Sequence, residues 1–162
     1  MDDDGPTPLT ASAIDYALDG ARRAITRLGG SSDPRVIAHA AAEAAFWIAA
    51  VDEGLGGKPE REAYIEARRQ GAVDDLMKGI RCVRNASVHR ELARVAISGG
   101  GLTVPFAVPF SITVIPRWID EAPSCRYESQ CQSYVRELAG KDVIPTLERA
   151  TDWLAQYESG GG

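Results

Sequence analysis

The chain has 162 residues, enough for one substantial core and too few for two ordinary domains. Hydrophobic residues make up 44% and charged residues 25%, which excludes the disordered and membrane classes of protein. The net charge of -5 and the acidic opening MDDDGPTP, where a secretory signal would be basic, argue against a general nucleic-acid coat and favour a cytoplasmic protein.

The three cysteines, Cys82, Cys125 and Cys131, are odd in number and contain no C-x-x-C pair. This pattern fits neither a disulfide framework nor a zinc site of familiar spacing. We therefore expect reduced thiols and no metal or other cofactor.

The first predicted helix runs from about residue 10 to residue 28. Its apolar residues recur at spacings of three and four, and Gly29 and Gly30 end it. Residues 1–8 and 159–162 have little to bury, so we predict disordered ends around a single helical domain over residues 9–158.

A second helix should begin at Asp33, an N-cap residue, with Pro34 in the first turn, and run through an Ala-rich stretch to the glycines at 54, 56 and 57. Most of its circumference is apolar, which predicts the central helix of a bundle. His39 lies within this stretch and is expected to face the core or a neighbouring helix.

Residues 59–97 are predicted to be helical, as one long helix or as a pair broken near Gly71 or Gly79. Gly99 to Gly101 end this run. The pattern then changes, because apolar residues alternate with mostly small or polar ones from Leu102 to Val114, the period of a strand.

Pro105 and Pro109 lack backbone N–H groups and would leave one edge of this strand without a regular series of hydrogen bonds, so the strand should pair on one side only. Three partners remain open: residues 117–119, residues 127–134 and a strand of another subunit.

A last helix is predicted after Asp142, with Pro145 tolerated in its first turn. The expected fold is therefore mainly α: a bundle of four to five helices with a short β segment, at about 102–119, inserted before the C-terminal helix.

One segment points to chemistry. Residues 78–94, KGIRCVRNASVHRELAR, hold five basic residues against one acid within an acidic chain. On a helical wheel, Lys78, Arg81, Asn85 and His89 share a polar face. Arg84 instead falls in the apolar stripe, where a guanidinium needs a wet cleft or a partner such as Glu43, Asp52 or Glu53.

The run Arg84-Asn85-Ala86-Ser87-Val88-His89 resembles the R-N-x-x-x-H motif of the HEPN domain superfamily. The resemblance covers about residues 10–97. It implies a helical bundle that dimerises so that two copies of the motif meet across a cleft. Many members of this family are metal-independent ribonucleases of toxin–antitoxin or antiphage systems.

The resemblance implies Arg84, Asn85 and His89 as the catalytic residues, with His89 as acid and base and Arg84 stabilising charge at phosphorus. Lys78, Arg81, Arg90 and Arg94 would bind the RNA backbone. A C2 homodimer would supply the second proton-transfer group. RNA, and an antitoxin or defence-system protein, are the implied partners, with no membrane.

Three other interpretations stay open. The chain would be a non-enzymatic interaction module if the bundle and the half-blocked strand bind a partner protein. A DNA-binding regulator would use the basic segment, although no compact helix-turn-helix precedes it. A thiol enzyme would use Cys82, with Arg81 and Arg84 nearby to lower its pKa.

Overall fold

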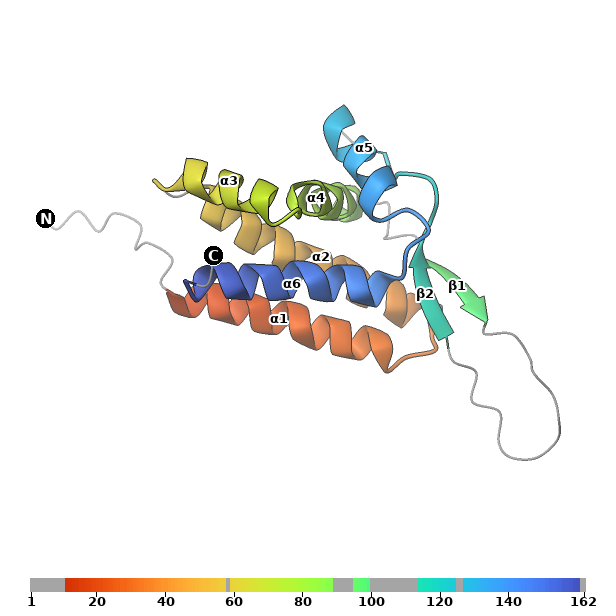
Figure 1. The fold of residues 1–162 in the computed structure, drawn as a ribbon. Helices are drawn as coiled ribbons and strands as arrows, with labels where there is room; N and C mark the ends of the chain where they lie inside the picture. Colours follow the sequence, from red (N-terminus) through yellow and green to blue (C-terminus); the bar gives the residue numbers. More distant parts are fainter. Residues whose placement is uncertain (1–10, 58, 89–94, 100–113, 125–126, 161–162) are drawn as a thin grey trace, which may run out of the picture.

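A computed structural model describes residues 11–57, 59–88, 95–99, 114–124 and 127–160. The described residues form a helical bundle with a small two-stranded sheet at one end (Figure 1). The elements in chain order are α1 (Ala11–Gly29), α2 (Pro34–Gly56), α3 (Arg61–Gln70), α4 (Asp74–Val88), β1 (Val95–Gly99), β2 (Val114–Trp118), α5 (Glu128–Glu137) and α6 (Val143–Glu158).

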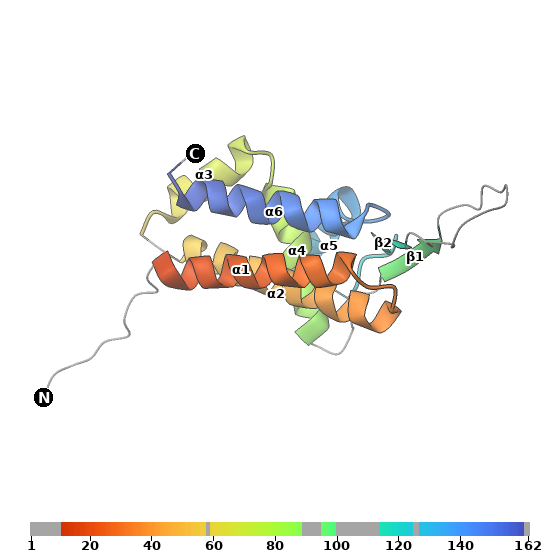
Figure 2. The ribbon, with the colours of Figure 1, turned by 90° about the horizontal axis from the view of Figure 1, so that it is seen from below.

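Helices α1, α2 and α6 run side by side along the length of the bundle (Figures 1 and 2). The predicted start of α2 is confirmed, because the Asp33 carboxylate accepts a hydrogen bond from the Arg35 amide at 2.8 Å and Pro34 occupies the first turn. Helix α2 contacts α1, α3, α4 and α6, which makes it the central helix that its apolar composition predicts.

The predicted break near Gly71 is confirmed, since α3 ends at Gln70 and α4 begins at Asp74. Ala72 takes a positive φ of 52° in this turn, and the Arg149 guanidinium donates to its carbonyl oxygen at 2.6 Å. The prediction that the helix extends to residue 97 is wrong, because residues 95–99 form strand β1.

Strand β1 pairs antiparallel with β2, with Val95 opposite Trp118 and Gly99 opposite Val114. The expected short β segment before the last helix is thus confirmed by β2, which pairs with residues that were predicted to be helical. Residues 102–113 lie outside the described residues. Trp118 also exchanges backbone hydrogen bonds with Lys141 and Gly140, which ties the hairpin to the start of α6.

Helix α5 occupies residues that were considered as a strand partner, so that alternative is wrong. Helix α6 begins after Asp142 as predicted, and Leu147, Ala150 and Leu154 bury its inner face. Among the described helices, none combines the length and the apolar composition needed to cross a bilayer.

Candidate functional site

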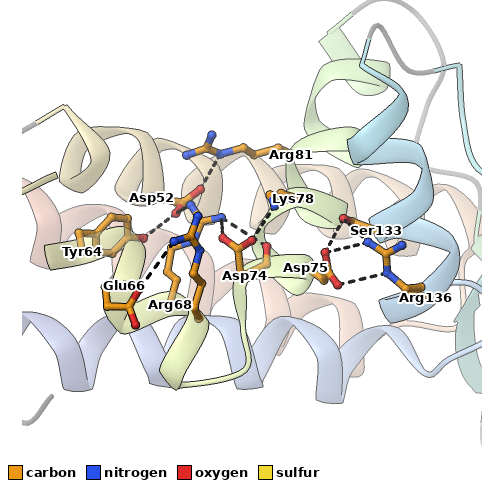
Figure 3. A network of polar contacts seen from close by, with 11 residues as sticks. Asp52, Tyr64, Glu66, Arg68, Asp74, Asp75, Lys78, Arg81, Ser133 and Arg136 are labelled. Atoms are coloured by element: carbon orange, nitrogen blue, oxygen red, sulfur yellow. Dashed lines mark hydrogen bonds and ion pairs between the residues drawn. The ribbon is translucent and has the colours of Figure 1, made fainter. Parts of the chain in front are cut away.

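A buried carboxylate lies where α2, α3 and α4 meet. Asp52, on α2, is 1% exposed and accepts three hydrogen bonds (Figure 3). The donors are the Tyr64 hydroxyl at 2.5 Å, Nη1 of Arg68 at 2.9 Å and Nε of Arg81 at 2.5 Å. One buried acid therefore fixes α2, α3 and α4 relative to one another.

Arg68 extends this network to the start of α4. Its Nη2 donates to Asp74 Oδ1 at 2.6 Å, and the guanidinium lies 5.8 Å from the centre of the Tyr64 ring. Lys78 closes the other side of Asp74 with an Nζ–Oδ2 distance of 2.6 Å. We call these six residues the Asp52 network: Asp52, Tyr64, Arg68, Asp74, Lys78 and Arg81.

The Asp52 network holds three basic and two acidic side chains, and this balance shapes its ionisation. Burial, together with the charge of Asp52, raises the pKa of the Tyr64 hydroxyl well above its ordinary value. Burial acts to raise the pKa of Asp74, but hydrogen bonding from Lys78 and the charge of Arg68 outweigh it and lower that pKa. Asp74 therefore stays ionised and Tyr64 stays neutral near pH 7.

Arg84 lies beside this network, near the C-terminal end of α4. It forms an ion pair with Glu53 of α2, one of the three acids expected as its partner. The Arg84 side chain is 24% exposed and that of Glu53 is 48% exposed, so the pair is open to solvent on one side. The Nε atom of Arg84 is buried and has no hydrogen-bond partner.

Asn85 points to a different neighbour from Arg84. Its side-chain amide donates to Gln130 Oε1 on α5 at 3.1 Å, whereas Arg84 pairs with α2. An amide nitrogen carries two hydrogens, so this bond leaves Asn85 one further donor. Adjacent motif residues thus link α4 to two different helices.

The predicted phosphate-binding residues divide into two groups. Lys78 and Arg81 are ion-paired within the Asp52 network. Arg81 uses Nε for this pair, and Figure 3 shows its terminal nitrogens outside the contacts with Asp52. His89, Arg90 and Arg94 lie outside the described residues.

His39 and Cys82 both differ from expectation. His39 is exposed on α2 instead of facing the core. Cys82 is fully buried and disulfide-bonded, so the expectation of reduced thiols is wrong for this residue, while Cys131 is a free cysteine. A buried, oxidised Cys82 also removes the thiol-enzyme interpretation.

A second polar cluster joins α4 to α5. Arg136 donates to both oxygens of Asp75 at 2.9 and 3.1 Å, and the Ser133 hydroxyl donates to Asp75 at 2.8 Å (Figure 3). These hydrogen bonds lower the pKa of the Asp75 carboxyl. The sequence analysis predicted neither this cluster nor the roles of Tyr64 and Arg68. The available signal for those two roles was Asp52, an acid within the apolar run of α2.

No family model, curated protein or solved structure matches this chain. Within the described ranges, no group of three or more His, Cys, Asp or Glu side chains could hold a metal ion. The site instead contains Arg84, whose side chain is partly exposed, and Asn85, which has one remaining hydrogen to donate. Both lie on α4, which the Asp52 network joins to α2 and α3.

Proposed function

We propose that this protein is a metal-independent endoribonuclease of the HEPN type, acting in a toxin–antitoxin or antiphage system. The observation that carries the proposal is Arg84, whose side chain is 24% exposed, pairs with Glu53 and has a buried Nε without a hydrogen-bond partner. It lies near the end of α4, a helix that the Asp52 network joins to α2 and α3. Arg84 begins the R-N-x-x-x-H motif, in which His89 follows five residues later.

In the proposed reaction, His89 removes the proton of an RNA 2′-hydroxyl, and the oxygen attacks the adjacent phosphorus. The bond from phosphorus to the 5′-oxygen breaks, and this leaving oxygen takes a proton from a second acid. The products end in a 2′,3′-cyclic phosphate and a 5′-hydroxyl. Because each chain brings one histidine in the motif, the second acid would come from another copy in a homodimer.

Arg84 would stabilise the negative charge that develops on the phosphorane. Glu53 is the positioning residue, since it holds the Arg84 side chain until a phosphate replaces it. Asn85 would use its remaining hydrogen to orient His89 or the scissile phosphate. The terminal nitrogens of Arg81, the exposed side of Lys78, and Arg90 and Arg94 would bind the RNA backbone.

The proposal is tested with single-stranded RNA in EDTA, using the wild type, His89→Ala and an RNA that carries one 2′-deoxy residue at a mapped cleavage position. We expect cleavage by the wild type with a cyclic-phosphate product, none at the 2′-deoxy position, and none by His89→Ala. Cleavage at the 2′-deoxy position, or undiminished cleavage by the variant, would overturn it. If an antitoxin masks cleavage in vitro, expression of the wild type should arrest cell growth and His89→Ala should not.

A non-enzymatic interaction module remains the second candidate. The observation that favours it is that Arg84, Arg81 and Lys78 all form ion pairs within the fold. If the protein is such a module, substituting Arg84 lowers the melting temperature, and neither the wild type nor the variant cleaves RNA. Measuring melting temperature and RNA cleavage on the same variants separates the two candidates.

The proposal also places the protein in the cytoplasm, where its RNA substrates are. A disulfide at Cys82 is uncommon in that compartment. Alkylation of Cys82 in freshly denatured cell extract therefore checks the location: modification shows a reduced thiol, and protection that reducing agent removes shows an oxidising compartment.

A further inference from the structure

The side-chain amide of Asn85 makes a single hydrogen bond within the described part of the chain, and the acceptor lies on another helix. Its Nδ2 atom donates to Oε1 of Gln130, in the first turn of α5, at 3.1 Å. Both side chains are partly buried. An asparagine amide carries two N–H hydrogens and a carbonyl oxygen, so this bond leaves one hydrogen and Oδ1 available.

The contact with Gln130 fixes the direction of the Asn85 amide. The torsion that turns an asparagine amide is broad and roughly two-fold, so an amide without a partner adopts several orientations. Because the amide is planar, a partner on one of its hydrogens also sets the directions of the second hydrogen and of Oδ1. Gln130 therefore selects one orientation of the Asn85 side chain before any ligand binds.

Helix α5 keeps Gln130 in place because it is packed against α4 (Figure 1). In the first turn of α4, both oxygens of Asp75 accept hydrogen bonds from Arg136 of α5. Further along α4 the two helices approach closely, since a Cβ at Gly79 would lie 2.7 Å from Leu138 Cδ1. The position of the Gln130 amide is thus set by contacts along the whole crossing of the two helices.

We propose that Gln130 is a positioning residue of the candidate site, which orients the Asn85 amide so that its second hydrogen faces the reacting groups. This inference rests on the proposed function, in which that hydrogen orients His89 or the scissile phosphate. An amide that is already oriented loses little rotational freedom when RNA binds, so more of its hydrogen-bond energy is available to the reaction. The site then includes α5, which lies beyond the residues 10–97 that the resemblance to HEPN domains covers.

The contact is tested first without RNA, by NMR of protein labelled with a nitrogen isotope at asparagine alone. Asn85 is the only asparagine of the chain, so the spectrum holds one pair of side-chain amide signals. Gln130→Met keeps the length of the side chain and removes its amide, so this pair should move, with the hydrogen-bonded proton shifting upfield. Gln132→Met is the control and should leave the pair in place, because the Gln132 amide donates to Glu128 within α5. An unmoved pair in Gln130→Met would overturn the proposal.

The role in the reaction is tested by RNA cleavage at saturating RNA. Gln130→Met should lower the rate roughly three- to tenfold, the cost of orienting one free side chain. Gln130→Glu keeps an acceptor for Asn85 and should restore most of the rate, and Gln132→Met should match the wild type. In an Asn85→Ala background, where the residual rate is followed at high protein concentration, Gln130→Met should cause no further loss, because Gln130 acts only through Asn85. A further loss of the same size, or an equal loss in Gln130→Glu, would overturn the proposal.

The two measurements separate this inference from the proposed function. If the wild type cleaves RNA and Gln130→Met cleaves it equally fast, the role of Gln130 is overturned and the ribonuclease proposal is kept. If the wild type shows the amide contact but neither cleaves RNA nor arrests growth, the ribonuclease proposal is overturned, and the role of Gln130 in the reaction is overturned with it.

Discussion

Arg84 of α4 and Glu53 of α2 form an ion pair that is partly exposed to solvent, and Glu53 directly follows the buried Asp52 along α2. An anion that binds the guanidinium competes with the Glu53 carboxylate, which already pairs with Arg84 Nη2. Glu53 therefore holds the Arg84 side chain in place when no anion is bound, and it weakens the binding of an anion to Arg84.

This competition predicts that Glu53→Gln binds single-stranded RNA more tightly than the wild type. Freeing Arg84 for one phosphate should steepen the dependence of log affinity on log salt by about 0.7. Fluorescence anisotropy at several salt concentrations measures both quantities. Asp19→Asn, which breaks an exposed pair with Arg23 on α1, is the control and should change neither.

Asp52→Asn should destabilise the fold strongly. The substitution removes the charge that partners the buried Arg68 and part-buried Arg81, so the free energy of unfolding should fall by about 3 kcal/mol. For a chain of this size, the melting temperature should drop by roughly 6–12 °C. Asp19→Ala should lower the free energy of unfolding by less than about 1 kcal/mol, because its ion pair with Arg23 is exposed. Equal decreases for the two variants in urea denaturation would contradict a structural role for the Asp52 network.

Tyr64 should make the protein sensitive to alkaline pH. Its pKa is raised in the folded state by burial, so the hydroxyl stays neutral when the unfolded chain ionises near pH 10. The stabilisation is fully present below about pH 10 and is lost as the pH rises above it. Tyr64→Phe should therefore be less stable than the wild type at pH 7, by about 1–2 kcal/mol, and the stability difference should shrink above pH 10 in urea titrations.

The crossing of α4 and α5 depends on Gly79. A Cβ at this position would lie 2.7 Å from Leu138 Cδ1 and 3.3 Å from the Tyr134 Cα. Gly79→Ala should thus destabilise the protein even though alanine favours a helix. Gly54→Ala in α2 meets nothing within 4 Å and should instead stabilise by about 0.5–1 kcal/mol. A stabilising Gly79→Ala in thermal melts would contradict the close packing of these helices.

Sequence periodicity was enough to predict α1, α2 and α6, because each carries a continuous apolar face and clear end signals such as Asp33 and Gly29. It failed for β1, a five-residue strand that depends on pairing with β2, a segment distant along the chain. It also missed α5, whose mostly polar sequence is held by contacts such as that between Arg136 and Asp75 of α4.

In the candidate site too, features set by neighbouring residues were predicted from the sequence, whereas contacts between distant segments were not. The unusual position of Arg84 on the helical wheel predicted that it needs an acidic partner, and Glu53 is that partner. The wheel also grouped Asn85 with Arg81 and Lys78, but Gln130 of the unpredicted α5 holds Asn85. Tyr64 and Arg68 could not be assigned, because only the fold brings α3 against Asp52.

RNA cleavage and melting temperature, measured together for Arg84→Ala, test the proposed ribonuclease most directly. Arg117→Ala is the matched control, because Arg117 lies on β2 and is also ion-paired, with Asp142 before α6. If Arg84 stabilises the phosphorane, Arg84→Ala should lose at least about 100-fold in cleavage rate, on the scale of one removed transition-state contact, while its melting temperature stays within a few degrees of that of Arg117→Ala. Unchanged cleavage together with a large drop in the melting temperature of Arg84→Ala would contradict it.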